Sequence, residues 1–344
     1  MEDQAEKLRE IMRQKKDESA GEQAAKSAAP KESTLKVSVL KEQPPKDAAS
    51  KEPPKETAVA KTPDKSKTRG AEPPGKKTRI ITVTSGKGGV GKTNLSVNMA
   101  LAFARIGKKV VVLDADLGLA NVNVMLNMIP KYNLYHVIKK QKTIPEILVE
   151  TEYGISIVAG ASGFSQIANM GETERHDFIN EFDTLSFADI IIIDTSAGVS
   201  SNVMDFIAAA DDAIIITTPE PTAITDAYGI IKIIAMEYDT INIGLKLVVN
   251  RAKGAVEAKS IADRITTISG QFLNLKVDYL GFIYDDQAVA HAVRKQKPFM
   301  IIDPKCKASL CIQHLVERMD RNKPVESDGI GAKIRKIFSR TGTT

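Results

Sequence analysis

The chain has 344 residues, of which 42% are hydrophobic and 5% aromatic, and its formal net charge is +5. This length suffices for one large domain or two, and no apolar run approaches the roughly 18 residues of a membrane-spanning helix. Two cysteines and the lack of a signal-peptide pattern exclude a disulfide-stabilised scaffold and predict a protein of the reducing cytosol.

The positive charge is concentrated in residues 1–78. This segment contains 18 basic and 14 acidic side chains, so the remainder is close to neutral and does not indicate a general DNA-binding surface. It has no aromatic residue and holds eight of the fifteen prolines. Such a composition cannot bury enough apolar surface to offset the entropy of ordering, so we predict a disordered linker over residues 17–77.

Residues 1–16 differ from this linker, because Ala5, Leu8, Ile11 and Met12 fall on one side of a helical wheel. The stretch Asp3-Gln4-Ala5-Glu6-Lys7-Leu8-Arg9 fits the pattern D-Q-A-x-x-L-R. It resembles the N-terminal activating helix of the flagellar-number regulators called FlhG, FleN or YlxH. The resemblance implies that this helix docks on FlhF, a GTPase of the signal-recognition-particle type, through Asp3, Gln4, Ala5, Leu8 and Arg9. A frayed, solvated chain end is the alternative.

The segment Ser85–Thr93 reads S-G-K-G-G-V-G-K-T and satisfies the P-loop pattern G-x-x-x-x-G-K-[ST]. A β-branched strand is predicted before it, over residues 79–84, and a helix after it, over residues 94–106. Backbone N–H groups of such a loop close around a polyphosphate, Lys92 neutralises the β- and γ-phosphates, and the Thr93 hydroxyl binds Mg²⁺. The predicted nucleotide-binding residues of this loop are Gly86, Lys87, Gly88, Gly89, Val90, Gly91, Lys92, Thr93 and Asn94.

An ordinary P-loop does not need a lysine at the position of Lys87. The form with two lysines resembles the deviant Walker A motif of the MinD/ParA family of ATPases. The resemblance implies that Lys87 reaches across a dimer interface to the nucleotide of the partner subunit, so that ATP joins two copies of the chain. A cation supplied in this way stabilises charge that develops in phosphoryl transfer. A solvated loop lysine is the alternative.

Beyond the P-loop, Ile- and Val-rich strands alternate with helical patterns. Nearly unbroken apolar strands are typical of a parallel sheet covered on both faces. Strands are predicted at residues 110–113, 155–158, 190–193, 213–217, 245–249 and 280–283, and helices at residues 177–185, 202–209, 226–236, 258–267 and 308–318. We therefore predict an α/β domain over residues 78–322, a doubly wound, mostly parallel sheet of the MinD-like P-loop NTPase type.

Three carboxylates follow predicted strands, where such a sheet binds its ligand. Asp114 and Asp116 end one strand, and the family resemblance implies that Asp116 positions the attacking water while Asp114 supports the Mg²⁺ shell. A cap on the next segment is the alternative for Asp114. Asp194 ends the apolar run 190–193 in the Walker B arrangement, so we expect it to hold Mg²⁺ through water, with Thr93 as a direct ligand.

Other loop residues are assigned through the same resemblance. Residues 195–200 resemble switch II, in which Gly198 offers its N–H to the γ-phosphate, although the family usually has Gly or Pro where Ser196 stands. Residues 218–222 resemble the segment that flanks the dimer interface. Asn250, next to Arg251, is expected to read adenine, and an Asx turn that closes the strand is equally compatible with it.

The metal-binding residue types outside these motifs are sparse. Cys306 and Cys311 are expected to be structural thiols, since the C-x-x-C of a subunit-bridging iron–sulfur cluster is absent. The four histidines form no metal-binding pattern.

The end of the chain, residues 323–344, is predicted to contain a linker and an amphipathic helix. Ile330, Ile334, Ile337 and Phe338 form an apolar stripe, and Lys333, Arg335 and Lys336 are assigned to the opposite, basic side. Such a helix lies in the headgroup plane of an anionic membrane, and two of them on an ATP dimer bind more strongly than one. A partner-binding or frayed helix is the alternative.

Together these features predict a slow, Mg²⁺-dependent ATPase whose ATP-bound dimers associate with the inner face of the cell membrane. The resemblance implies that it controls flagellar number and placement through FlhF, with flagellar C-ring proteins or a flagellar transcription activator as further partners. A division-site regulator of the MinD kind and a partitioning ATPase of the ParA kind are the alternatives, besides a nucleotide-gated scaffold with negligible turnover.

Overall fold

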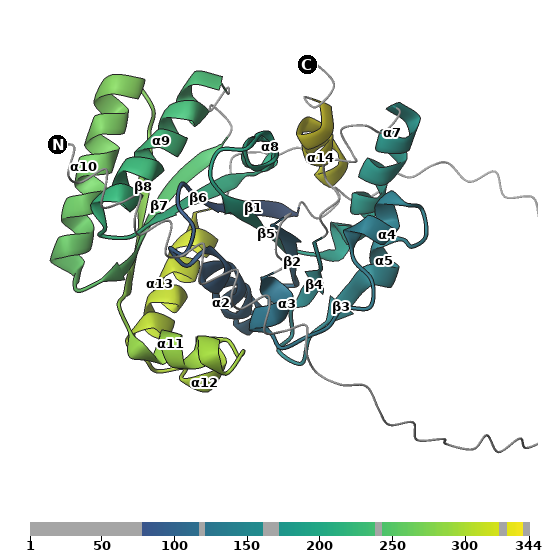
Figure 1. Cartoon of the computed structure of the whole chain (residues 1–344), viewed down its shortest axis with the longest axis horizontal. Helices are drawn as coiled ribbons and strands as arrows, with labels where there is room; N and C mark the ends of the chain where they lie inside the picture. The colour runs from purple at the N-terminus through teal and green to yellow at the C-terminus, as the bar shows by residue number, and fades with distance from the viewer. Residues whose placement is uncertain (1–77, 117–120, 161–171, 238–242, 323–328, 340–344) are drawn as a thin grey trace, which may run out of the picture. The chain divides into compact units, whose positions relative to one another are not determined.

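The structure is a computed structural model that describes residues 78–116, 121–160, 172–237, 243–322 and 329–339 (Figure 1). Within this part, one eight-stranded sheet has the order β3-β4-β2-β5-β1-β6-β7-β8. Every neighbouring pair is parallel except β3 and β4. The strands are β1 (Arg79–Ser85), β2 (Val110–Ala115), β3 (Leu148–Glu150), β4 (Ser156–Val158), β5 (Ile190–Ala197), β6 (Asp212–Thr217), β7 (Gly244–Ala252) and β8 (Asp278–Tyr284). The predicted segments 1–16 and 17–77 lie outside the described residues.

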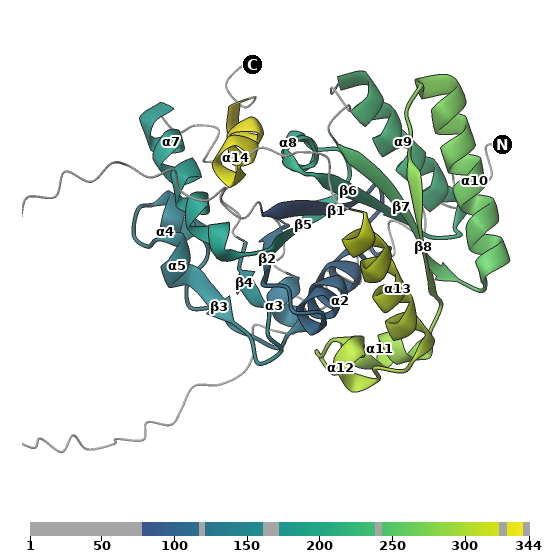
Figure 2. The same cartoon turned by 180° about the vertical axis from the view of Figure 1, so that it is seen from behind.

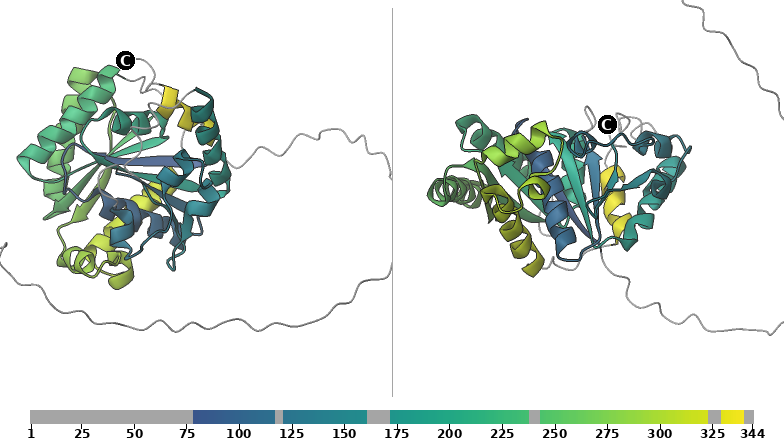
Figure 3. Two further views of the ribbon diagram at one scale, coloured as in Figure 1. Left: turned by 45° about the vertical axis from the view of Figure 1, so that its right-hand side comes forward. Right: turned by 90° about the horizontal axis from the view of Figure 1, so that it is seen from below.

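Helices cover both faces of this sheet (Figures 1 and 2). They are α2 (Lys92–Arg105), α3 (Val122–Met125), α4 (Leu134–Ile138), α5 (Ile144–Ile147), α7 (Glu172–Glu181), the 3-10 helix η1 (Phe182–Phe187), α8 (Ser201–Ala209), α9 (Pro221–Glu237), α10 (Ala255–Leu273), α11 (Gln287–Arg294), α12 (Phe299–Ile302), α13 (Lys307–Arg321) and α14 (Ile330–Ser339). Helices α2 and α13 lie against one face, and α8, α9 and α10 against the other. Figure 3 shows α9 and α10 at one end of the sheet and α4, α5 and α7 at the other.

The alternation of side chains along β1 explains how one strand serves two cores. Ile81 and Val83 pack with α2 and α13, whereas Ile80 faces the opposite layer. All three are 0% exposed. Because both faces are covered, the central strands need apolar residues at every position, which is why they read as continuous runs in the sequence.

The predicted fold class is confirmed, and so are the predicted strands. The strand that the sequence did not reveal is β3, which has only three residues and pairs antiparallel with β4 at the sheet edge. The helix predicted over residues 177–185 is divided between α7 and η1. The helix predicted from residue 226 begins at Pro221, because proline is well tolerated in a first helical turn.

Parallel strands bring their carboxyl ends to one edge of the sheet. In the register of β1, β5 and β2, Asp194 lies beside Val83 on one side and beside Asp114 on the other. The P-loop follows β1 directly, so both carboxylates lie at the start of α2. The fold thus gathers three separate sequence motifs at one place.

Helix α14 packs against α7, η1 and α8 (Figure 1, yellow). Ile330 and Ile334 are 6% and 2% exposed and belong to the core on that face of the sheet. Lys333 is buried between them, and its Nζ lies 2.5 Å from Asp211 Oδ2 and 3.3 Å from the Thr78 carbonyl oxygen. This helix is therefore joined to the amino end of the sheet by an ion pair as well as by apolar contacts.

The assignment of Lys333 to the solvated side of α14 was wrong. Residues at i, i+3 and i+4 share one helical face, so Lys333 lies with Ile330 and Ile334. A sequence pattern assigns a lysine to water because it does not reveal a buried carboxylate partner such as Asp211. Arg335 is exposed, as predicted. The side chains of Lys336, Ile337 and Phe338 lie outside the described part of the structure.

Candidate nucleotide site

A cavity of about 950 Å³ opens at the carboxyl ends of the central strands. Its walls come from the P-loop between Gly88 and Asn94, from Asp116 at the end of β2, from Asn250 and Arg251 of β7, and from α11. Its volume lies in the range of cofactor sites. The structure thereby brings together most of the residues that the sequence assigned to nucleotide binding.

The P-loop backbone needs its glycines at particular points. Gly91 has φ of +104°, and a Cβ at this position would lie 2.4 Å from Asn250 Nδ2. Gly86 has no such φ, but a Cβ there would lie 2.4 Å from the Asp226 carbonyl oxygen of α9. Side chains at these two positions would therefore push the loop away from β7 and α9.

Lys92 is drawn into the loop, where its Nζ donates to Ser85 Oγ at 3.0 Å. Burial lowers the pKa of Lys92, while the carboxylates of Asp194 and Asp116 act in the opposite direction. A cation that is partly desolvated in this way interacts more strongly with a phosphate than a solvated one does. Ser85 was not among the predicted site residues.

Asp194 combines deep burial with an open coordination position. Its side chain is 1% exposed, Ser96 Oγ donates to Oδ1 at 2.8 Å, and the nearby Thr93 hydroxyl acts to lower the pKa of the carboxyl. Oδ2 is buried without a hydrogen-bond partner among the described residues. Burial raises the pKa of Asp194 to about 6. An orphaned carboxylate oxygen beside a threonine hydroxyl is an oxygen donor set that fits Mg²⁺.

Asp114 organises the loop that follows β2. Its carboxylate accepts backbone N–H groups from Asp116 at 3.1 Å, Asn121 at 2.9 Å and Val122 at 3.1 Å. Burial and the nearby Asp194 raise the pKa of Asp114 to about 7. The structure therefore shows the capping role that the sequence left open, and a contribution of Asp114 to a Mg²⁺ shell stays a prediction. Asp116 faces the cavity and accepts Asn121 Nδ2 at 3.0 Å.

Asn250 and Arg251 hold the P-loop from the side of β7. Asn250 Nδ2 donates to the Val90 carbonyl oxygen at 2.7 Å, and an Arg251 guanidinium nitrogen donates to that of Gly89 at 2.9 Å. Arg251 has φ of +56°, and its side chain contacts the loop through this hydrogen bond. The reading of adenine by Asn250 stays a prediction, because the bond seen here is made to the protein.

Lys87 lies outside the cavity of its own chain. Its Nζ is 2.9 Å from Glu220 Oε2 and 2.9 Å from Thr222 Oγ1, both at the start of α9, and its side chain is 40% exposed. The hydrogen bond from Lys87 lowers the pKa of Glu220. The sequence placed residues 218–222 near a dimer interface but did not identify Glu220 as the partner of Lys87.

The contact of the Gly198 N–H with a γ-phosphate stays a prediction, because this N–H is bonded within the protein here. Gly198 has φ of +101°, and its N–H donates to the Ser85 carbonyl oxygen at 2.9 Å instead of pointing into the cavity. The next residue, Val199, is 47% exposed. The strand β5 continues to Ala197, so Gly198 follows the strand directly.

Comparison with known proteins then identifies the family. The model of the CobQ/CobB/MinD/ParA nucleotide binding domain matches residues 81–299. The chain belongs to the MinD/ParA family. The family consists of ATPases, and the matched residues include the P-loop and the buried acids of the cavity.

Two curated relatives within the MinD/ParA family have flagellar names. The chain is 36% identical to the antiactivator FleN of Pseudomonas aeruginosa over 243 residues. This match covers 70% of this chain and 86% of FleN. It is 36% identical over 229 residues to the flagellum site-determining protein YlxH of Helicobacter pylori, covering 66% and 76% of the two chains. Among solved structures, the MinD cell division protein of Aquifex aeolicus matches with a TM-score of 0.58 and 25% identity over 73% of this chain and 100% of that one.

In the described part of this MinD/ParA-family chain, no group of three or more His, Cys, Asp or Glu side chains is arranged to hold a metal ion, and no helix is long and apolar enough to cross a membrane. Cys306 caps α13 by accepting the Ser309 N–H at 3.4 Å, and Cys311 is buried. Neither thiol is in a disulfide.

The buried carboxylates predict how stability depends on pH. Asp194 and Asp114 have folded pKa values of about 6 and 7, above the ordinary value of 3.8, so the folded state binds more protons than the unfolded state between about pH 4 and 7. The free energy of unfolding should therefore fall as pH rises through this window. The thermal midpoint of the protein in EDTA without nucleotide should be higher at pH 5.5 than at pH 8.

The control is Asp194→Asn, which keeps the size of the side chain and removes one titrating group. It should raise the midpoint at pH 8 and reduce the difference between the two pH values. An unchanged difference would show that Asp194 does not titrate in this range.

Proposed function

We propose that this protein is an ATP-dependent dimerising switch that controls the number or placement of flagella. The observation that carries the proposal is the position of Lys87. This residue belongs to the P-loop motif and yet does not line the cavity of its own chain. A lysine at this position can contact the phosphates of a nucleotide that is bound by a facing copy of the chain. The ATP-bound form is then a homodimer in which each chain completes the site of the other.

Different residues of the chain would bind the phosphates, hold the metal ion and orient the attacking water at each site. Backbone N–H groups of the P-loop and the Lys92 ammonium bind the phosphates, and Thr93 with Asp194 would hold Mg²⁺, which neutralises charge on the phosphate oxygens. Asp116 orients the attacking water, and Lys87 of the facing copy stabilises the charge that develops in the transition state. The phosphates also attract Lys92 away from Ser85.

Release of Lys87 from Glu220 is compatible with such a switch. The pair is exposed to solvent, and exposed ion pairs contribute little to stability. A phosphate in the facing site carries more charge than one carboxylate and is less screened within an interface. Dimer formation therefore exchanges a weak contact of Lys87 for a stronger one.

Complementation between two inactive variants tests this arrangement. Lys87→Ala should bind ATP but neither dimerise on ATP nor hydrolyse it, and Asp116→Ala should dimerise without hydrolysis. In a mixture, the site of the Lys87→Ala chain contains its own Asp116 and receives Lys87 from the other chain, so ATP hydrolysis should return to a substantial fraction of the native rate. The control is Lys276→Ala, an exposed lysine far from the P-loop, which should leave dimerisation and turnover unchanged.

Phosphate release by the mixture at increasing Asp116→Ala gives the readout. A mixture as inactive as its two components would show that Lys87 does not act on the facing site. Recovery would separate a role in trans from a simple defect in folding.

The flagellar assignment is supported by the names of the two relatives at 36% identity. By this proposal residues 1–16 stimulate the GTPase FlhF, and flagellar C-ring proteins or a transcription activator are further partners. Division-site regulation of the MinD kind is the second candidate, since MinD of Synechocystis is 32% identical over 245 residues. It does not require Asp3 to Arg9.

A peptide experiment distinguishes these two candidates. GTP hydrolysis by purified FlhF from the same organism should rise when a peptide of residues 1–16 is added, because by this proposal the residues of the D-Q-A-x-x-L-R pattern contact the GTPase. A peptide with Gln4→Ala and Leu8→Ala keeps the length and all of the charge and should not stimulate. No stimulation at saturating native peptide would exclude the FlhF role and favour the division-site candidate.

Membrane attachment through α14 is the third part of the proposal. The protein would be cytoplasmic and associate with the inner membrane face when ATP-bound. Since Ile330 and Ile334 are packed on the domain, the helix must undock before its apolar side can enter a bilayer. The Lys333–Asp211 ion pair opposes undocking, because a buried carboxylate that loses its partner is strongly destabilised.

Matched substitutions on α14 test this step. Lys333→Met leaves Asp211 buried without its cation, so the helix should undock and cosedimentation with vesicles containing anionic lipid should rise, together with faster hydrogen exchange over residues 330–335. Arg335→Met removes a charge from the exposed side of the same helix and should not release it. Faster exchange in Lys333→Met without more vesicle binding would exclude α14 as the membrane anchor.

A further inference from the structure

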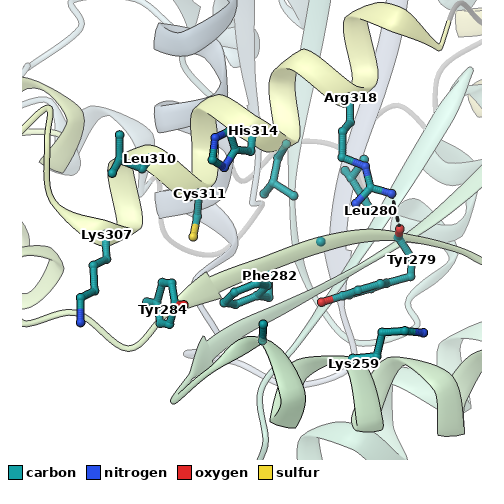
Figure 4. A pocket seen from close by; sticks show the side chains of 13 residues that line it. Lys259, Tyr279, Leu280, Phe282, Tyr284, Lys307, Leu310, Cys311, His314 and Arg318 are labelled. Atoms are coloured by element: carbon teal, nitrogen blue, oxygen red, sulfur yellow. Dashed lines mark hydrogen bonds between the residues drawn. The ribbon is translucent and has the colours of Figure 1, made fainter.

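A second cavity lies along β8 and between α13 and the first turns of α10 (Figure 4), and Tyr284 is the one lining residue that it shares with the nucleotide cavity. It is a groove of about 510 Å³. Strand β8 ends the sheet and pairs with β7 alone among the described strands. Phe282 and Tyr284 form much of the floor, and Leu310, which is 43% exposed, forms the wall on α13.

Helix α13 presents two different faces. Ile312, Val316 and Met319 are at most 1% exposed and pack into the core that α13 shares with α2. The groove side carries Lys307, Leu310, Cys311, His314 and Arg318, which follow helical spacing and line one wall in Figure 4. The fold uses the first face and leaves this mixed apolar and basic stripe accessible.

Every ionisable side chain with a formal charge at neutral pH that lines the groove is basic. Lys259 is already paired with Asp263 at 2.6 Å, so Lys307 and Arg318 are the cations that remain at the two ends. Charge therefore disfavours a second copy, which would bring the same basic groove against itself. It also disfavours the chain's own residues 1–78, since they carry 18 basic and 14 acidic side chains.

The backbone of β8 disfavours an added strand as the occupant. Arg318 donates a hydrogen bond to the Tyr279 carbonyl oxygen at 3.1 Å, and the register with β7 shifts between Tyr279 and Gly281. Capped carbonyls and irregular pairing protect a sheet edge from strand addition. A helix needs no such backbone bonds, and the eleven-residue spacing from Lys307 to Arg318 matches about 17 Å, or three helical turns.

We propose that this groove binds a three-turn amphipathic helix of a partner protein whose apolar stripe is flanked by acidic side chains. The apolar side chains of that helix lie between Leu310 and Phe282, and its carboxylates pair with Lys307 and Arg318. Helix-in-groove recognition of this kind uses anchors at i, i+3, i+4 and i+7. The surface is separate from the phosphate site and does not depend on the flagellar assignment.

Fluorescence anisotropy with the full chain tests the proposal. The probe is a labelled helical peptide of about 14 residues with leucines at i, i+3, i+4 and i+7 and glutamates beside them. A second peptide with lysines in place of the glutamates should bind about tenfold more weakly or less, because its charges oppose the basic rim. Leu310→Ser and Lys307→Glu should each weaken binding of the acidic peptide about tenfold.

Two control variants match these substitutions elsewhere on the surface. Lys276→Glu makes the same charge change at a side chain that is 87% exposed, and Phe272→Ser removes an apolar side chain that is 74% exposed on α10. Both should bind the acidic peptide as the native chain does. The far-UV circular dichroism spectrum should be unchanged in all four variants, which shows that they fold.

Five outcomes would overturn the proposal, one of them in self-association of the chain and four in peptide binding. The four in peptide binding are absence of saturable binding of the acidic peptide, equal binding of the lysine peptide, equal losses in the control variants, and displacement of the probe by an unlabelled peptide of residues 1–16. The last result would identify the chain's own N-terminus as the occupant. Self-association that Leu310→Ser abolishes would identify a second copy.

Discussion

Two buried carboxylates at the ends of neighbouring strands are the constraint on which the rest of this site depends. Asp114 and Asp194 are paired in register on β2 and β5, and each is 1% exposed. Because the two carboxylates are buried on neighbouring strands, their negative charges repel each other, and this repulsion contributes to the raised pKa of Asp114. Hydrogen bonds from three backbone N–H groups offset the burial of Asp114, whereas Oδ2 of Asp194 has no partner among the described groups. The charge of the pair is therefore least compensated at Asp194 Oδ2, which a bound cation can stabilise.

At the amino end of the sheet, by contrast, the buried acids are paired with basic side chains. There Arg79 and Lys246 both contact Asp212, at 2.6 and 3.2 Å, and Lys333 contacts Asp211. Each of these acids has a cation beside it, so this end contributes to stability and joins β1, β6, β7 and α14. The carboxyl end keeps an incomplete arrangement, as sites that must bind and release a ligand do. One sheet thus has its ion-paired acids at the amino end and the acids of the candidate site at the carboxyl end.

The sequence predicted the fold, the P-loop and Asp194 because each follows from a local pattern. Continuous Ile and Val runs identify buried parallel strands, and the glycines of the loop identify a phosphate site whatever the remainder of the chain does. Lys333 and Gly198 could not be assigned in the same way. The position of Lys333 depends on Asp211, 122 residues away, and the N–H of Gly198 is taken by the carbonyl of Ser85 on another strand. Such partners belong to tertiary structure, and no helical wheel or motif contains them.

The contacts of the P-loop indicate how a bound phosphate influences distant surfaces. Asn250 and Arg251 hold the loop to β7, and Lys87 joins it to α9 through Glu220. Gly86 lies so close to Asp226 that no side chain fits between the loop and α9. A loop that tightens on a nucleotide must therefore move relative to both elements or carry them along. Closely packed contacts of this kind have few intermediate arrangements. For this reason the release of Lys87 from Glu220 and the movement of α9 are expected to occur as one step. The surface formed by α9 would then differ between the nucleotide-bound and the nucleotide-free protein.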